Sequence, residues 1–132
     1  MRNGSDNSTA QPLELRNRTK QFAYRIVRLF RALPRTTEAQ VAGKQLLRCG
    51  TSVAANYRAV CLARSHAEFI SRMGIVLEEA DEAVFWLELL SDNGIVQRNK
   101  IYSLLTEANE LALIFGASQR TAKSTRINSI AQ

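Results

Sequence analysis

The sequence predicts an all-α fold, an antiparallel up-down-up-down four-helix bundle. Apolar residues recur at helical spacing in four segments, and no stretch alternates as a strand would. The segments are separated by short connections, the arrangement typical of antiparallel bundles. The chain has 132 residues, enough for one domain to bury a core. We expect the bundle over residues 15–118, a disordered N-terminal tail over 1–14 and a loose basic C-terminal tail over 119–132.

The first helix is predicted over residues 15–33. Pro34 follows it, and proline ends a helix because it has no backbone N–H to donate. At 100° per residue, one arc of this helix is apolar. The residues of that arc are Leu15, Phe22, Ile26, Leu29, Phe30 and Leu33.

The second helix is predicted over residues 38–63, with Thr37 and Gln40 at the spacing of a capping box. Two glycines lie on its inner face. Glycine inside a helix costs about 1 kcal/mol relative to alanine, so we expect a neighbouring helix to approach closely there. The inner face consists of Gly43, Leu46, Gly50, Val53, Tyr57, Val60 and Cys61.

The third helix is predicted over residues 66–91 and the fourth over 97–115. Ser65 and Glu68 form a second capping-box pattern, and Asn93-Gly94 marks the end of the third helix. The third helix directs Phe69, Met73, Val76, Leu77, Ala80, Val84, Leu87 and Leu90 inward. The fourth directs Ile101, Leu104, Leu105, Ala108, Leu111, Ala112 and Phe115 inward.

Charge is distributed unevenly along the chain, whose net charge is +6. Residues 1–64 hold 12 basic and 3 acidic side chains, residues 65–118 hold 3 basic and 9 acidic ones, and 119–132 add 3 basic ones. A basic half favours a polyanionic partner, whereas a basic half beside an acidic half also favours packing between copies of the chain.

The cysteines and the N-terminus indicate a cytoplasmic protein. Cys49 and Cys61 are twelve positions apart on one predicted helix, about 18 Å, which is too far for a disulfide. We expect both to be buried, reduced thiols. Residues 1–13 contain no apolar signal-peptide core, and no apolar run is long enough for a membrane span.

Features of enzymes and metal sites are lacking in this sequence. His66 is the only histidine, and at a helix start we expect it to be solvated. No nucleotide-binding glycine motif and no HExxH motif occurs. Glu78, Glu79, Asp81 and Glu82 are spread around their helix, so they predict no metal site. We expect no enzymatic activity, cofactor or metal; an enzyme based on these carboxylates would lose its activity on Glu82→Gln.

Arginines dominate the outer side of the first two predicted helices. Arg28, Arg31 and Arg35 lie opposite the apolar arc of the first helix, with Lys20 and Tyr24 nearby. The planar guanidinium suits bidentate contact with phosphate, so this side predicts a nucleic-acid surface, although such faces also occur simply for solubility. The predicted contacts to RNA or DNA are Arg25, Arg28, Arg31, Arg35, Lys44, Arg48, Arg58 and Arg64.

A second apolar stripe on the third helix predicts an oligomer interface. Several large apolar residues fall outside its inner arc and alternate with glutamates, which could meet arginines of a neighbouring copy and close a ring. The alternative is that the third helix is buried more widely within one chain. The predicted interface residues are Ile75, Glu79, Glu82, Phe85, Trp86 and Leu89.

Residues 51–90 resemble the rRNA intervening-sequence protein family of four-helix bundles, which includes the accessory variability determinant of diversity-generating retroelements. The family pattern runs Ser-Val-Pro-x-Asn-Ile-Ala-Glu-Gly, then Arg-Ser-x-x-Glu-Phe, then a Glu-rich helix. The matching residues are Ser52, Val53, Asn56, Arg64, Ser65, Glu68, Phe69 and Glu82. Two departures are clear: Ala54 replaces the proline, and Arg58-Ala59-Val60 replaces Ala-Glu-Gly.

The resemblance implies a homopentameric ring without enzymatic activity and, in the retroelement branch, a basic barrel that binds nucleic acid and a reverse transcriptase. Two functional hypotheses follow. One is an oligomeric protein that binds RNA or DNA, as an accessory factor of a reverse transcriptase. The other is a structural or protein-interaction module with no role at nucleic acid.

Overall fold

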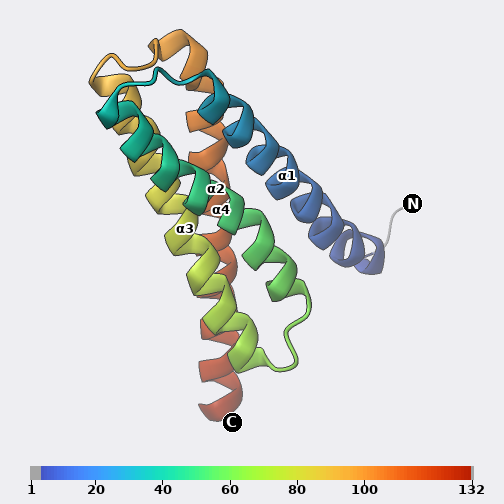
Figure 1. Ribbon diagram of the computed structural model, residues 1–132. Coiled ribbons are helices and arrows are strands. Elements are labelled where there is room, and N and C mark those ends of the chain that lie inside the picture. Colours follow the sequence, from blue (N-terminus) through green and yellow to red (C-terminus); the bar gives the residue numbers. More distant parts are fainter. Residues whose placement is uncertain (1–3, 132) are drawn as a thin grey trace.

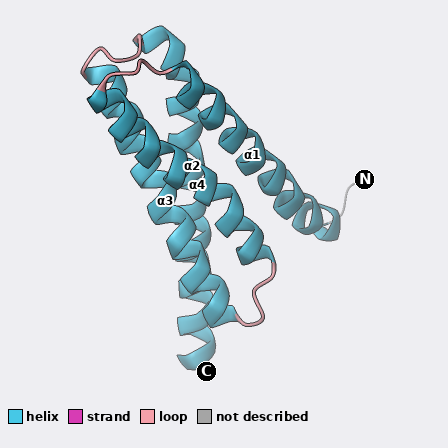
Figure 2. Ribbon diagram, in the orientation of Figure 1, coloured by secondary structure: helices cyan, strands magenta, loops and turns pink. Residues whose placement is uncertain are grey.

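Four helices make up the protein in the computed structural model, which describes residues 4–131 and, of these, the side chains of residues 11–126 (Figure 1). The helices are α1 (Gly4–Ala32), α2 (Thr37–Cys61), α3 (His66–Asp92) and α4 (Arg98–Ala131). No strand occurs within 4–131, and the three connections are short (Figure 2). The all-α prediction of four mutually packed helices is confirmed.

The helices pack in chain order, α1 on α2, α2 on α3 and α3 on α4. Each runs opposite to its predecessor, whereas α1 meets α4 over only a short stretch (Figure 1). Toward its N-terminal end, α1 leans away from the other three helices. The molecule is therefore an antiparallel bundle with one side partly open.

The outer helices are longer than predicted. α4 continues past Phe115 to Ala131, so residues 119–131 are helical and not loose. Ala122 is buried, and the Gln119 side-chain amide donates a hydrogen bond to the Ile70 carbonyl oxygen at 3.2 Å. His66 Nε2 lies 2.7 Å from the Ala122 carbonyl oxygen, so this ring contacts α4 and is not simply solvated. The C-terminal part of α4 is thus held by one small buried side chain and two polar contacts. Such contacts leave no apolar repeat in the sequence, so the sequence did not predict that the helix continues past Phe115.

At the other end, α1 begins at Gly4, with Pro12 inside it. Residues 4–14 of the predicted tail are therefore helical, and residues 1–3 lie outside the described part of the chain. The prediction of disorder rested on the polar composition of residues 1–14.

Two of the three caps predicted at helix ends are confirmed by the structure. Ser65 Oγ accepts a hydrogen bond from the Glu68 backbone N–H at 3.1 Å, as predicted. Asn93 is the C-cap of α3, and Gly94 follows with a φ of 69°, also as predicted. The capping box predicted at Thr37 is wrong. The N-cap of α2 is Thr36, whose side chain makes no cap hydrogen bond.

The core follows the predicted inner faces. Phe22 and Ile26 of α1, Leu46 of α2, Leu87 of α3 and Phe115 of α4 are all fully enclosed. One residue of these faces is misplaced: Cys61, in the last turn of α2, is exposed, whereas Cys49 is buried. α1, which packs on α2, leans away toward its N-terminal end, and this end lies beside the last turn of α2 that carries Cys61.

The inward glycines do mark a close approach of α1. A Cβ atom added at Gly43 would meet the Leu33 and Phe30 side chains, and one at Gly50 would meet Ile26. The predicted close packing is confirmed, and it brings the basic sides of α1 and α2 next to each other. Among the described residues, no helix combines the length and apolar character of a membrane span.

Candidate nucleic-acid interface

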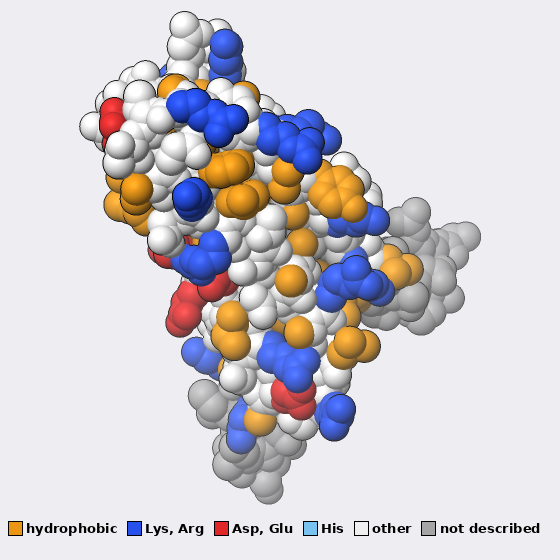
Figure 3. Space-filling view, in the orientation of Figure 1, with side chains coloured by type: hydrophobic (Ala, Val, Ile, Leu, Met, Phe, Trp, Pro, Cys, Tyr) orange, Lys and Arg blue, Asp and Glu red, His pale blue; other side chains and the backbone are white. Residues whose placement is uncertain are grey.

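Positive side chains gather on the face formed by α1 and α2 (Figure 3). Arg28, Arg31, Arg35, Lys44 and Arg58 are all exposed. None of them forms an ion pair within residues 11–126. Their charges are therefore uncompensated within that part of the chain, which is the condition under which a cationic surface attracts a polyanion.

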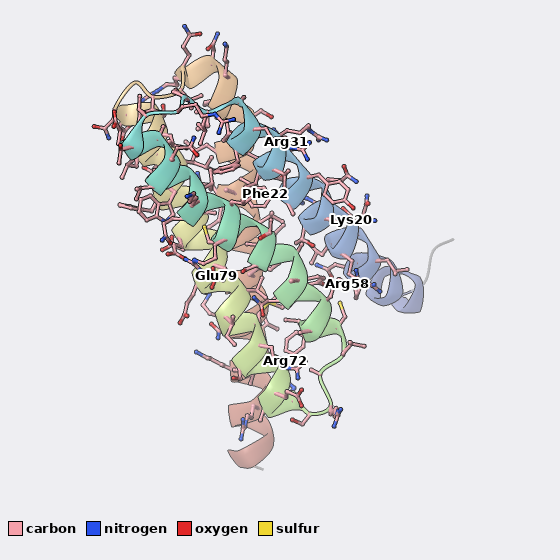
Figure 4. All side chains as sticks on the ribbon, in the orientation of Figure 1. Lys20, Phe22, Arg31, Arg58, Arg72 and Glu79 are labelled. Carbon is pink, nitrogen blue, oxygen red and sulfur yellow. The ribbon has the colours of Figure 1, made fainter. Side chains whose placement is uncertain are left out.

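A groove of about 640 Å³ lies between α1 and α2 on this face. Its walls carry the cations Arg16 and Lys20 from α1 and Arg58 from α2, with Tyr24 beside them. In Figure 4, Lys20 and Arg58 lie on either side of the space between these helices. No carboxylate is among the described residues that line it, so all of its described charged side chains are cations.

Lys20 and Tyr24 are one helical turn apart, and the Lys20 Nζ lies 5.7 Å from the centroid of the Tyr24 ring. Arg16 lies one further turn back on the same stripe. The spacing of four residues between Arg16, Lys20 and Tyr24 is visible in the sequence. Arg16 was not among the predicted contacts, because the sequence does not show that this stripe of α1 faces Arg58 of α2 across a groove. Only the packing of the two helices shows this.

Arg48 is already bound by carboxylates of the same chain. Its guanidinium lies 2.5 Å from a Glu82 carboxylate oxygen and 3.3 Å from one of Glu79. The hydrogen bond to Glu82 raises the pKa of Arg48 further above its usual value. The predicted phosphate contact Arg48 and two predicted interface acids thus form one intramolecular cluster on the surface between α2 and α3.

Arg25 has an internal partner as well: its Nη2 donates a hydrogen bond to Ser103 Oγ at 2.9 Å. Arg18, outside the predicted set, is held by Glu107 and Glu110 of α4. These contacts join α1 to α4. They direct both arginines toward α4 and away from the cationic face of α1 and α2.

The other predicted cations lie at three places. Arg28, Arg31, Arg35 and Lys44 lie toward the connection between α1 and α2, whereas Arg58 lies in the groove further along α2. Arg64 is exposed in the connection between α2 and α3, at the opposite end of α2.

The apolar stripe predicted on α3 is partly open. Ile75 and Phe85 are 44% and 55% exposed, whereas Trp86 and Leu89 are half-buried and pack against the core. The Phe85 and Trp86 rings meet edge to face, with their centroids 5.0 Å apart. Trp86 Nε1 is enclosed without a hydrogen-bond partner among the described residues. Of this stripe, Ile75 and Phe85 are therefore the apolar side chains most available to a neighbour.

These features define a small antiparallel helical bundle with a cationic α1–α2 face. The family model described as "23S rRNA-intervening sequence protein" matches residues 11–117. The chain belongs to this family, which confirms the resemblance found in the sequence.

A solved structure is also similar to the chain: a protein of unknown function from the S23 ribosomal protein family of Bacteroides thetaiotaomicron. It is 33% identical, with a TM-score of 0.76, and the match covers 83% of this chain and 97% of that one. No curated protein matches the chain. The retroelement branch and a reverse-transcriptase partner stay predictions.

Proposed function

We propose that this protein is a non-enzymatic binder of RNA or DNA, which it holds by the phosphate backbone on the face of α1 and α2. The observation that carries the proposal is the set of exposed cations of that face that form no ion pair within residues 11–126: Arg28, Arg31, Arg35, Lys44 and Arg58. The family's description, a protein of the 23S rRNA intervening sequence, agrees with a nucleic-acid partner.

Binding of this kind has a measurable signature. Each cation that neutralises a phosphate releases a condensed counterion, so affinity falls with salt at a slope of about −0.9 per contact on duplex DNA. Backbone contacts carry no base information, so we expect weak sequence preference. Arg28, Arg31 and Arg35 together would then account for a slope of about −3.

The test is fluorescence anisotropy with a labelled RNA hairpin and a labelled DNA duplex, between about 50 and 200 mM salt. The test variant reverses the charge at Arg28, Arg31 and Arg35. We expect an affinity loss of at least about tenfold at low salt and a salt slope smaller by about 3.

The matched control reverses three exposed cations on α4: Lys100, Arg120 and Lys123. Both variants change the net charge equally, so general repulsion affects them equally. Equal losses in the two variants, or unchanged affinity in the α1 variant, would refute the proposed face. Absence of binding by the unchanged protein would instead favour the structural or protein-interaction module.

We also propose that the working unit is a ring of identical chains joined through the α3 stripe, a pentamer as the resemblance implies. The exposed Phe85, whose ring meets the half-buried Trp86 edge to face, supports this, since contiguous apolar surface usually meets a partner. Ile75 is a second exposed apolar side chain on the same helix. The acids Glu79 and Glu82 contribute less than the charge pattern suggests, because Arg48 of the same chain already neutralises them.

Sedimentation velocity tests the assembly. A pentamer would have about five times the chain mass of 14.8 kDa, and the mass follows from the sedimentation and diffusion of the boundary. Ile75→Asp with Phe85→Asp should yield helical monomers. The control, Tyr102→Asp with Leu113→Asp on α4, changes side chains that are 65% and 71% exposed and should leave the assembly intact. Dissociation by the α4 pair alone would move the interface to α4.

A further inference from the structure

The groove between α1 and α2 differs from the rest of the cationic face because it is concave and contains an aromatic ring. Its volume of about 640 Å³ falls within the range of small-ligand sites. Cations stand on both of its walls, and Thr51, Ala54 and Ala55 line it on the side of α2. Short side chains on α2 leave the space open between the arginines.

Tyr24 supplies the feature that a purely electrostatic surface lacks. Tyr24 is 47% exposed, and the cation in contact with its ring, among residues 11–126, is Lys20, which is also exposed. A cation–π contact at an exposed site is weak, so a nucleobase can displace the ammonium and stack on the ring. The displaced Lys20 would remain beside Arg16 and Arg58, where the phosphate of the same nucleotide would lie.

Two departures from the family pattern meet in this groove. Ala54 stands where the pattern has proline, and Arg58 stands where it has alanine. Both residues line the groove. Relative to the family pattern, Arg58 adds a cation to it, and Ala54 is the small side chain beside that cation.

We infer that the groove is a subsite for one unpaired nucleotide, whose base stacks on Tyr24 and whose phosphate is held by Arg16, Lys20 and Arg58. The inference rests on the proposed function and adds a preference for single strands. Inside a duplex, both faces of each base are already stacked on neighbours, so an interior paired base cannot stack on Tyr24; only the two terminal pairs have a free face. The flat part of the cationic face makes no such distinction.

The test compares a labelled single-stranded oligodeoxythymidylate with the blunt duplex that contains it, by fluorescence anisotropy. Tyr24→Ala should lower single-strand affinity about tenfold and leave duplex affinity unchanged, since stacking on an aromatic side chain serves unpaired bases only. Tyr24→Phe keeps the ring and should retain full affinity. The matched control is Tyr102→Ala, which removes an exposed tyrosine of α4 and should change neither affinity.

Arg58→Ala provides a second measurement. It should reduce the salt slope of single-strand binding by about 0.7, the value for one phosphate contact. Unchanged single-strand affinity in Tyr24→Ala, or equal losses for both probes, would overturn the subsite while leaving the proposed function in place. Failure of the unchanged protein to bind either DNA probe would overturn the subsite, and failure to bind the RNA hairpin as well would overturn the proposed function. A changed sedimentation coefficient in Tyr24→Ala would make the groove a contact between chains and also overturn the subsite.

Discussion

Replacing Gly50 by alanine tests the close packing of α1 on α2, on which the groove depends. A Cβ atom at Gly50 would lie 2.8 Å from Ile26 Cγ1 and 3.0 Å from Ile26 Cγ2. Carbon atoms in favourable contact are about 3.5–4.0 Å apart, so something must shift. Ile26 has no exposed surface, and its β-branched side chain has few rotamers available.

Two effects oppose each other in this variant. Alanine inside a helix is favoured over glycine by about 1 kcal/mol, whereas overpacking a core costs about 1–3 kcal/mol. Because Ile26 cannot move into solvent, we expect the steric cost to exceed the helical gain. The expected net loss in the free energy of unfolding is about 1 kcal/mol, which lowers Tm by about 4 °C.

Gly116→Ala on α4 is the matched control. Its new Cβ would lie 3.3 Å from Arg120 Nη1, the far end of a flexible side chain, and 3.8 Å from Leu77 Cδ1. Here the helical gain should dominate and raise the free energy of unfolding by up to about 1 kcal/mol. Urea unfolding at one protein concentration measures both variants, so that any assembly affects them equally.

A rise in stability for Gly50→Ala, equal to that of Gly116→Ala, would refute the close approach. A double variant gives a second check. Ile26→Ala alone should cost about 2–5 kcal/mol, since it empties a fully buried site. Combined with Gly50→Ala, the loss should be smaller than the sum of the two, because the clash has been removed.

Three further predictions concern a cap, the thiols and one arginine. Ser65→Ala should lower the free energy of unfolding by about 1 kcal/mol, because the hydroxyl accepts the first-turn N–H of α3; an unchanged urea midpoint would contradict this. Burial raises the pKa of Cys49 to about 12, whereas Cys61 is exposed. A disulfide reagent at pH 8 should therefore titrate one thiol in the native protein and both in urea, and Cys61→Ser should abolish the native reaction. Arg48→Ala should leave nucleic-acid affinity unchanged, because its guanidinium already binds carboxylates of α3; a loss in the anisotropy assay comparable to that of the α1 variant would show otherwise.

The helices were predictable from the sequence because their inner faces repeat at the helical period. Leu46, Val53 and Val60 on α2 fall seven residues apart, and all three are buried. Proline and glycine also mark ends by local chemistry, as Gly94 does with its positive φ. The C-terminal part of α4 escaped prediction because it is held by single contacts, such as that of Gln119 with Ile70, which leave no periodic signal.

For the candidate site, the sequence by itself determined that the first half of the chain is basic and that arginines lie opposite the apolar face of α1. Only the tertiary structure decided which cations remain available. Arg48 meets acids on α3 and Arg25 meets Ser103 on α4, whereas Arg58 joins Lys20 across the groove. Helical periodicity assigns each residue to a face of its own helix, but ion pairs and grooves depend on how separate helices are placed. That placement follows from the packing of all four inner faces together, including the approach of α1 to Gly43 and Gly50.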